Sequence, residues 1–293
     1  ESEYGRVRTH FQQQLICIFI ASNLWQEALS MFARRIIASG IIPVVFSLMT
    51  PPSSHANEAE ENPGVAEFHY FRVTDPIGFV TAIDTHYASE CAANWQRASG
   101  AIVILAQVSG DQATHMIYVG YPSYEKMAEG RVLFRSCAET SAMIATISNT
   151  TDTDSYSNVI FESVMQFNQD LIQKYYVKTD IKIAAAKEAD YSKAFLEFLA
   201  DYTTEEGVDR DLHAGFVNAS HHGINRVLFG NRDASHYVYF GGADLDSLIL
   251  NMKAMLSSEE YASFNQRVDA IRIVKNSALV EQLKFYPVER ESK

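Results

Sequence analysis

The chain has 293 residues, and its 36 Asp and Glu exceed its 24 Lys and Arg, which gives a formal net charge of −12 at pH 7. An acidic surface of this size argues against nucleic acid and anionic lipid as partners. The length suits one large domain or two small ones.

Residues 31–56 have the pattern of a secretory signal peptide. Arg34 and Arg35 form a basic region, an apolar run follows over 36–49, and Ser54-His55-Ala56 fits a small-x-small cleavage site. The apolar run is shorter than the roughly 20 residues that span a bilayer. We therefore expect cleavage near Ala56 and a periplasmic or secreted mature chain without a membrane span.

The segments on either side of this signal are predicted to lie outside the folded part of the chain. Residues 1–30 do not begin with methionine and are interpreted as an upstream extension, with a membrane anchor or a structured helix as the alternative. Residues 57–65 contain Glu58, Glu60 and Glu61 and predict an acidic linker.

The next part of the chain alternates between strand and helix periods. Asp75-Pro76 marks a helix start, because proline is favoured in the first helical turn. The patterns predict a strand at 67–73, a helix at 75–95, strands at 101–108 and 113–120, a helix at 121–147 and a strand at 158–167.

The second half repeats this order. Phe195, Phe198, Leu199 and Tyr202 recur at helical spacing and define one apolar face. The patterns predict a strand at 180–187, a helix at 189–207, an extended section at 213–230, a strand at 234–241, a helix at 243–268, and closing strands at 270–274 and 278–285.

One octapeptide occurs twice, as ATHMIYVG at 113–120 and as ASHYVYFG at 234–241. In a split βαβ unit this third strand is central, and its side chains alternate between the two faces of the sheet. His115 and Ile117 are therefore expected on one face, and Met116 and Tyr118 on the other.

The repeated order predicts an α+β fold. We expect two tandem ferredoxin-like βαββαβ units, at 66–170 and 178–290, whose antiparallel sheets pack as a pseudo-symmetric α/β barrel. This order resembles the dimeric α/β-barrel superfamily of antibiotic-biosynthesis-monooxygenase-like and stress-responsive barrel proteins, over roughly residues 66–290. The resemblance implies a superfamily that contains cofactor-free oxygenases, haem enzymes, isomerases and proteins of no known activity, so the fold does not fix the function.

His115 and His236 are the candidate catalytic residues. Each begins its third strand, after a turn that carries Asp111 or Asp233 and near a strand-to-helix corner that carries Asp75 or Glu188. These four carboxylates are the candidate supporting groups, since a His–carboxylate pair fixes the tautomer of a general base. The alternative is that each histidine only stabilises its hairpin.

A second set of candidates lines the space between the sheets. Tyrosine offers apolar area with a polar tip, which suits the wall of a pocket for a small organic ligand. The alternative is an aromatic core layer. The candidate ligand-binding residues are Tyr118, Tyr239, Met116, Tyr237 and His69.

The sequence predicts no metal site and no cofactor. His221 and His222 are neighbours in an extended segment and face opposite sides, so they cannot chelate one ion together. A haem ligated by one histidine is compatible with the resemblance, but no local motif supports it. Cys91 and Cys137 either form a disulfide in a secreted protein or remain two buried thiols.

No motif in the chain identifies a reaction, since GxxxxGK[ST], GxSxG and HExxH are all absent. The leading hypothesis is an exported protein that binds a small organic molecule between its sheets, as a monomer with an internal pseudo-dimer or as a weak homodimer. The alternatives are a cofactor-free monooxygenase-like enzyme with a His general base, and a protein-interaction module.

Overall fold

The computed structural model describes residues 64–169, 171–204, 210–230 and 232–287. The predicted upstream extension and signal peptide, and all of the predicted acidic linker before Gly64, lie outside these residues. Among the described residues, no helix is both long and apolar enough to cross a membrane.

The first unit contains four strands and four helices. They are β1 Val65–Val73, α2 Pro76–Tyr87, α3 Glu90–Ser99, β2 Ile102–Ser109, β3 His115–Tyr121, α4 Tyr124–Arg135, α5 Ala138–Thr150 and β4 Thr151–Phe167.

The second unit repeats the same order. Its elements are β5 Tyr175–Ile183, α6 Glu188–Thr204, α7 Arg210–Ala219, β6 His222–Gly230, β7 His236–Gly242, α8 Leu245–Leu256, α9 Glu259–Val268 and β8 Arg272–Tyr286. The duplicated βαββαβ order is confirmed, with a pair of helices at each helical position.

Several details of the predicted elements were wrong. The closing strands predicted at 270–274 and 278–285 are one strand, β8. Three of the four predicted helices, at 75–95, 121–147 and 243–268, are pairs, because a new helix starts within each of them. For example, the Ser89 side chain accepts a hydrogen bond from the Ala92 amide and caps α3. The section after residue 213 was predicted to be extended, but α7 occupies it as far as Ala219, and Phe216 and Val217 pack into the core against α6 and β7.

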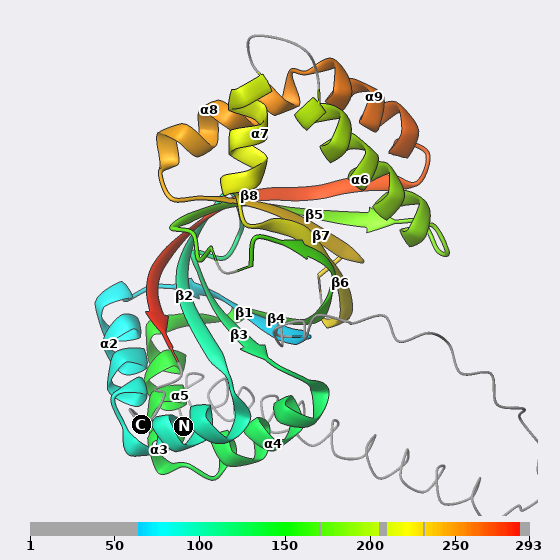
Figure 1. Ribbon diagram of the computed structural model, residues 1–293. Helices are drawn as coiled ribbons and strands as arrows, with labels where there is room; N and C mark the ends of the chain where they lie inside the picture. The colour runs from blue at the N-terminus through cyan, green and yellow to red at the C-terminus, as the bar shows by residue number, and fades with distance from the viewer. Residues whose placement is uncertain (1–63, 170, 205–209, 231, 288–293) are drawn as a thin grey trace, which may run out of the picture. The chain divides into compact units, whose positions relative to one another are not determined.

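The eight strands close into one antiparallel barrel in the order β1-β3-β2-β8-β5-β7-β6-β4 (Figure 1). Within each unit the third strand, β3 or β7, lies between the first and second strands, as predicted. The units join edge to edge, through β2 with β8 and through β4 with β6. Because every edge strand is paired, the two sheets form a single wall.

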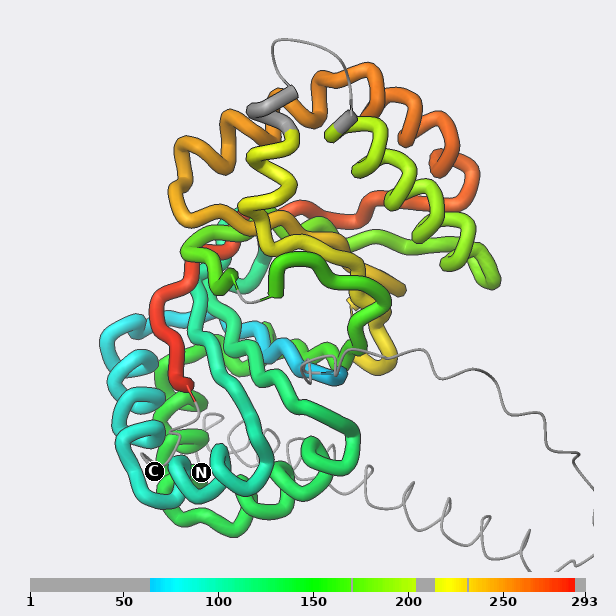
Figure 2. The backbone as a smooth tube through the Cα atoms, viewed as in Figure 1, coloured from blue at the N-terminus to red at the C-terminus, as the bar shows by residue number. Residues whose placement is uncertain are grey.

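The barrel wall separates three groups of buried side chains. Helices α2–α5 cover the outer face of the first unit and α6–α9 that of the second, with one core under each set (Figure 2). The third core lies inside the barrel and comes almost entirely from strands. On β1, for example, Phe68 and Tyr70 point into the barrel, whereas Val65 and Phe71 pack under the helices.

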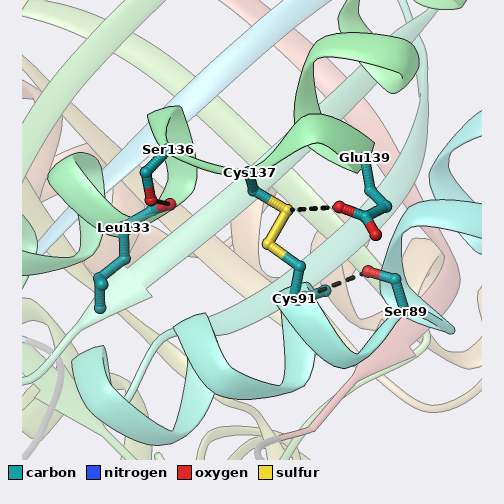
Figure 3. Close-up of a disulfide and its surroundings, with 7 residues drawn as sticks. Ser89, Cys91, Leu133, Ser136, Cys137 and Glu139 are labelled. Carbon is teal, nitrogen blue, oxygen red and sulfur yellow. Dashed lines mark hydrogen bonds between the residues drawn. A yellow bond between two sulfur atoms is a disulfide. The ribbon is translucent and has the colours of Figure 1, made fainter.

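A disulfide joins Cys91, in the first turn of α3, to Cys137, at the start of α5 (Figure 3). It closes a loop of 46 residues within the first unit. The sequence left open a disulfide or two buried thiols, and the structure has the disulfide.

Candidate functional site

The best-defined polar site lies at one mouth of the barrel, where the β2–β3 and β6–β7 turns meet. The Asp111 carboxylate of the first turn is paired with the Arg232 guanidinium of the second. Asn276 on β8 donates a second hydrogen bond to Asp111, at 2.9 Å. Two residues far apart in the sequence, one from each unit, thus hold the two hairpins together across the opening.

A buried ion pair lies just below this contact. Lys178 on β5 is 7% exposed, is paired with Asp180, and has its ammonium 4.7 Å from the centroid of the Tyr237 ring. Burial opposes the charge of Lys178, but Tyr70 and Asp180 outweigh it, so the pKa of Lys178 is raised. Lys178 therefore supplies a fixed positive charge at physiological pH.

Tyr70 and Arg232 complete the cluster. The Arg232 guanidinium stacks 4.3 Å from the centroid of the Tyr70 ring and lies 3.6 Å from Asp180. The buried Tyr70 hydroxyl makes no hydrogen bond of normal geometry among the described residues, and burial raises its pKa.

Two adjoining cavities open at this mouth. The larger has a volume of about 770 Å³ and the smaller of about 380 Å³, and they share Arg232, Lys275 and Asn276. The larger falls within the roughly 300–1,000 Å³ typical of small-molecule sites. It is lined by Arg72, Asp111, Gln112, Ala113, the segment 154–157 of β4 and the three shared residues, together with Gly110.

The opposite end of the barrel holds a tyrosine–histidine cluster. His221 Nδ1 lies 3.2 Å from the Tyr176 hydroxyl, and His221 Nε2 lies 3.1 Å from the Tyr239 hydroxyl. Burial and the neighbouring His222 lower the pKa of His221 to about 4, so its imidazole is neutral. A neutral imidazole with a partner at each nitrogen satisfies two buried hydroxyls and stabilises this end of the barrel.

The two candidate catalytic histidines both face the helices rather than the barrel interior. His115 packs its ring 5.5 Å from the Phe79 ring of α2, and its Nδ1 lies 3.0 Å from the Thr114 hydroxyl. Burial lowers the pKa of His115. The contacts described for His115 include no carboxylate, so the expected pair with Asp75 or Asp111 does not form.

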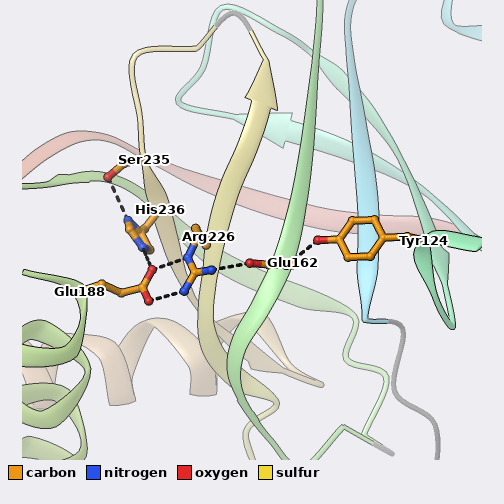
Figure 4. A network of polar contacts seen from close by, with 6 residues as sticks. All are labelled: Tyr124, Glu162, Glu188, Arg226, Ser235 and His236. Atoms are coloured by element: carbon orange, nitrogen blue, oxygen red, sulfur yellow. Dashed lines mark hydrogen bonds and ion pairs between the residues drawn. The ribbon is translucent and has the colours of Figure 1, made fainter. Parts of the chain in front are cut away.

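His236 does have the predicted carboxylate partner. Its Nε2 lies 2.7 Å from Glu188 Oε2, and its Nδ1 lies 2.9 Å from the Ser235 hydroxyl (Figure 4). Glu188 also accepts a hydrogen bond from Arg226 Nε. A second nitrogen of the same guanidinium, Nη1, donates to Glu162 Oε1 at 2.5 Å. The Arg226 hydrogen bonds are the main cause that lowers the pKa of Glu188, to about 2.

This network joins the two units. Glu162 lies on β4 and also accepts from the Tyr124 hydroxyl of α4, at 2.5 Å, whereas Arg226 lies on β6 (Figure 4). It therefore crosses the β4–β6 junction, and none of its six residues lines either mouth cavity.

The other supporting carboxylates have different partners from those expected. Asp75 caps α2, accepting from the Gly78 amide at 3.0 Å. Asp111 pairs with Arg232, and Asp233 pairs with Lys182 at 2.6 Å and Lys275 at 2.8 Å. Of the four, only Glu188 contacts a candidate histidine among the described residues.

Four of the five candidate ligand-binding residues do lie inside the barrel. Met116, Tyr237 and Tyr239 belong to its buried core, and Tyr118 packs against it. His69 does not, because it is one residue out of phase with Phe68 and Tyr70. Its Nδ1 lies 2.9 Å from the Tyr156 hydroxyl and its Nε2 3.6 Å from Glu67, on the helix side of β1.

The sequence reasoning missed Lys178, Asp180, Arg232 and Tyr70. Lys178 and Asp180 are two residues apart on β5, so they share a face. The strand predicted at 180–187 included Asp180 but not Lys178, so the pair was not visible on one strand. Arg232 gave no signal either, because Asp111 and Tyr70, two of its partners, come from the other unit.

Neither a protein-family model nor a curated protein sequence matches the chain. Solved structures do. An anthrone oxidase-like protein is 12% identical with a TM-score of 0.51, over 79% of this chain and 95% of that one. A candidate monooxygenase from Fusobacterium nucleatum is 10% identical with a TM-score of 0.50, over 76% and 94%. A heme-binding protein from Thermus thermophilus is 13% identical with a TM-score of 0.41, over 75% and 92%.

The similarity to the first two of these solved structures shows the fold of this chain. The predicted resemblance to dimeric α/β-barrel proteins is thereby confirmed at the level of architecture, with both halves of the barrel in one chain as a tandem pseudo-dimer. At this level of identity the function of those proteins does not transfer.

Neither His222 nor the mouth cavities offer a place for a haem. His222 is the buried histidine with an unsatisfied Nε2 under the helices of the second unit, but Phe167 and Phe240 stack on its ring at 4.8 and 5.3 Å. Buried side chains fill the layer around it. Neither mouth cavity is lined by a histidine.

Proposed function

We propose that the protein binds one small organic molecule with an anionic group in the larger cavity at the barrel mouth. The observation that carries the proposal is the cavity itself, about 770 Å³ in volume, with walls from both units. Its lining has three cations, Arg72, Arg232 and Lys275, against the two carboxylates Asp111 and Asp154. A ligand there would bridge the two halves of the pseudo-dimer.

The charges around the cavity indicate which ligand groups are accommodated. Among the described residues, the ion pair of Arg72 is a long, exposed one with Asp152, at 3.9 Å, so its guanidinium is available to a carboxylate or an ionised hydroxyl. Asn276 can orient the ligand through its amide. Lys178 adds little net charge to the site, because it is paired with the buried Asp180.

The mouth is a better place for a ligand than the centre of the barrel. Phe68, Phe161 and Tyr237 fill that centre, with ring centroids 4.6 Å apart for Phe68–Phe161 and 5.0 Å apart for Phe161–Tyr237. In this proposal the interior tyrosines lie beneath the bound ligand. The Lys178 ammonium lies over the ring of one of them, Tyr237.

The second candidate function is a cofactor-free monooxygenase-like enzyme. It is favoured by the fold shared with the anthrone oxidase-like and monooxygenase-named proteins. We rank it below binding because His115 and His236, the expected general bases, face the helices. An interaction module remains the third alternative, and helices α2–α9 supply its exposed surface.

Export of the mature chain is a separate proposal that follows from residues 31–56. Intact mass spectrometry of protein recovered from outside the cytoplasm tests it. A mass that starts near Asn57 supports cleavage, and a mass that retains the N-terminal segment contradicts it.

The binding proposal can be tested with 2-naphthoate, an aromatic carboxylate of suitable size, titrated by isothermal calorimetry. Arg72→Gln and Lys275→Gln should each weaken binding about 3- to 10-fold, as expected for losing one partly exposed charge contact worth roughly 0.7–1.4 kcal/mol. The matched control is Arg97→Gln on α3, a residue outside both cavities whose guanidinium contacts Asn94.

Wild-type protein and the Arg97→Gln variant should bind alike. Equal affinity in the wild type and in both cavity variants would contradict the proposal. So would an absence of binding by the wild type at millimolar concentration.

A further inference from the structure

A second cluster of reactive groups lies in the helices of the first unit, away from the mouth. The ligand atoms of Cys91, Cys137 and Glu139 all lie within 4.8 Å of one another (Figure 3). Cys137 is buried, Cys91 is half-buried and Glu139 is exposed. No step of the proposed ligand binding uses these residues.

The contact between Glu139 and Cys137 is unusual for a structural disulfide. A carboxylate oxygen of Glu139 lies 3.2 Å from Cys137 Sγ. A sulfur in a disulfide carries no proton to donate, so this carboxylate gains nothing from the contact. A thiol would donate to it, and two thiolates with a carboxylate would require a cation between them.

Both cysteines lie at the start of a helix. Cys91 is in the first turn of α3, and Cys137 is the N-cap of α5, where its own side chain makes no cap hydrogen bond. Once the disulfide is reduced, both sulfurs could bind a metal, which displaces their protons.

His86 is an unsatisfied polar group in the same region. It lies in the last turn of α2, is 2% exposed, and neither ring nitrogen has a hydrogen-bond partner among the described residues. Burial lowers its pKa, against the opposing effect of Glu139, so the imidazole is neutral. Its ring contacts Phe134, three residues before Cys137, at 5.4 Å.

We infer that the reduced protein binds a divalent zinc-class cation through Cys91, Cys137 and Glu139, with water at the fourth position. Two thiolates and one carboxylate suit Zn²⁺, which accepts sulfur and oxygen ligands in a tetrahedral site. Three protein ligands leave one coordination position open.

Reduction of the disulfide and binding of the metal balance in atoms and electrons, and they need no movement of the backbone. A dithiol reductant breaks the S–S bond, gives two thiols and is itself oxidised to a disulfide. Zinc then displaces two protons. Sulfurs each ~2.3 Å from a tetrahedral ion lie ~3.8 Å apart, which side-chain rotation permits for Cα atoms 6.2 Å apart. The disulfide and the metal are mutually exclusive, so binding requires reducing conditions.

The test uses the full chain, reduced with dithiothreitol and desalted without oxygen, then titrated with Co²⁺ as a spectroscopic substitute for zinc. We expect one Co²⁺ per chain, with a near-ultraviolet thiolate-to-cobalt absorption that Zn²⁺ abolishes. Cys91→Ser and Cys137→Ser should each remove this absorption. Cys17→Ser is the matched control for the third cysteine and should leave it unchanged.

Glu139→Gln gives a readout that does not depend on either cysteine, because Glu139 is exposed and its loss should not unfold the protein. This variant should bind Co²⁺ at least about tenfold more weakly. An absorption that survives Cys91→Ser or Cys137→Ser, equal affinity in Glu139→Gln, or equal Co²⁺ binding by the oxidised protein would overturn the inference. So would an absence of the thiolate absorption in the reduced wild type.

Discussion

The two copies of the octapeptide occupy equivalent places in the fold but have different surroundings. His115 and His236 each begin the central strand of a unit, and each has a hydroxyl beside Nδ1, from Thr114 or Ser235. Only His236 has a carboxylate, Glu188, at its other nitrogen. The duplication has kept the strand and the hydroxyl contact, but not the contact with a carboxylate.

The difference between the units follows from the residue at each strand-to-helix corner. In the first unit Asp75 caps α2 with its side chain, so its oxygen is occupied by the Gly78 amide. In the second unit Glu188 is the first residue of α6 and reaches both His236 and Arg226. A repeat in the sequence thus predicts a common backbone, while the polar partners of its side chains diverge.

The hairpin turns show the opposite asymmetry. The Asp111 side chain of the first unit is 6% exposed and is paired across the barrel mouth with Arg232. The Asp233 side chain of the second unit is 65% exposed and is paired with two lysines at the rim. Of the two turn carboxylates, the buried one, Asp111, therefore comes from the first unit, whereas Glu188, the carboxylate that contacts a histidine, comes from the second.

The largest expected effect is on Asp111. Asp111→Ala should lower the free energy of unfolding by about 3 kcal/mol, because it leaves Arg232 and the Asn276 amide without this buried partner. Asp233→Ala should produce no measurable change, because its contacts are exposed. Urea denaturation of the two variants measures the difference. Equal losses would show that the mouth contact does not hold the hairpins together.

The next effect is a pH dependence from Glu188. Its pKa is about 2 in the folded protein against an ordinary 4.5, so its stabilising contribution is complete above pH 4.5 and is lost as the pH falls toward 2. Between pH 5 and pH 2 the wild type should lose about 1–2 kcal/mol more stability than Glu188→Gln, after allowance for solvent screening. Parallel losses in the two proteins would contradict the ion pair.

A smaller effect separates the two histidines. A double-mutant cycle of His236→Ala with Glu188→Gln should give a coupling energy of about 1 kcal/mol, since the two side chains are in contact. The equivalent cycle of His115→Ala with Asp75→Asn should give about 0.3 kcal/mol or less. Comparable coupling in both units would mean that the carboxylates are equivalent after all.

The smallest effect concerns the paired tyrosines of the barrel interior. Tyr239→Phe removes the hydrogen bond to His221 and should cost about 1 kcal/mol. Tyr118→Phe should cost less, because among the described residues no hydrogen bond involves its hydroxyl. Thermal denaturation compares the two, and a larger loss in Tyr118→Phe would refute the assignment.

Much of the fold could be predicted from local patterns. The repeated octapeptide, the alternation of His115 through Tyr118 and the helical spacing of Phe195, Phe198 and Tyr202 are all properties of neighbouring residues. They predicted the strand order and the sides of the sheet. The helix breaks were missed because they depend on single caps, such as Ser89.

The site was less predictable because it depends on contacts between the units. The pairing of β2 with β8 and of β4 with β6 brings Asp111 to Arg232 over 121 positions. No periodic pattern in the sequence predicts this contact between Asp111 and Arg232. His69 was predicted to lie inside the barrel, but it lies on the helix side of β1. A shift of one residue along a strand moves a side chain to the other face of the sheet.

The most direct test of the central claim is a crystal structure of the protein soaked with 2-naphthoate. We predict density for one ligand per chain in the cavity among Arg72, Arg232 and Lys275, with its carboxylate toward these cations. Ligand density at any other position, or a mouth cavity that stays empty at a saturating concentration, would contradict the proposed function.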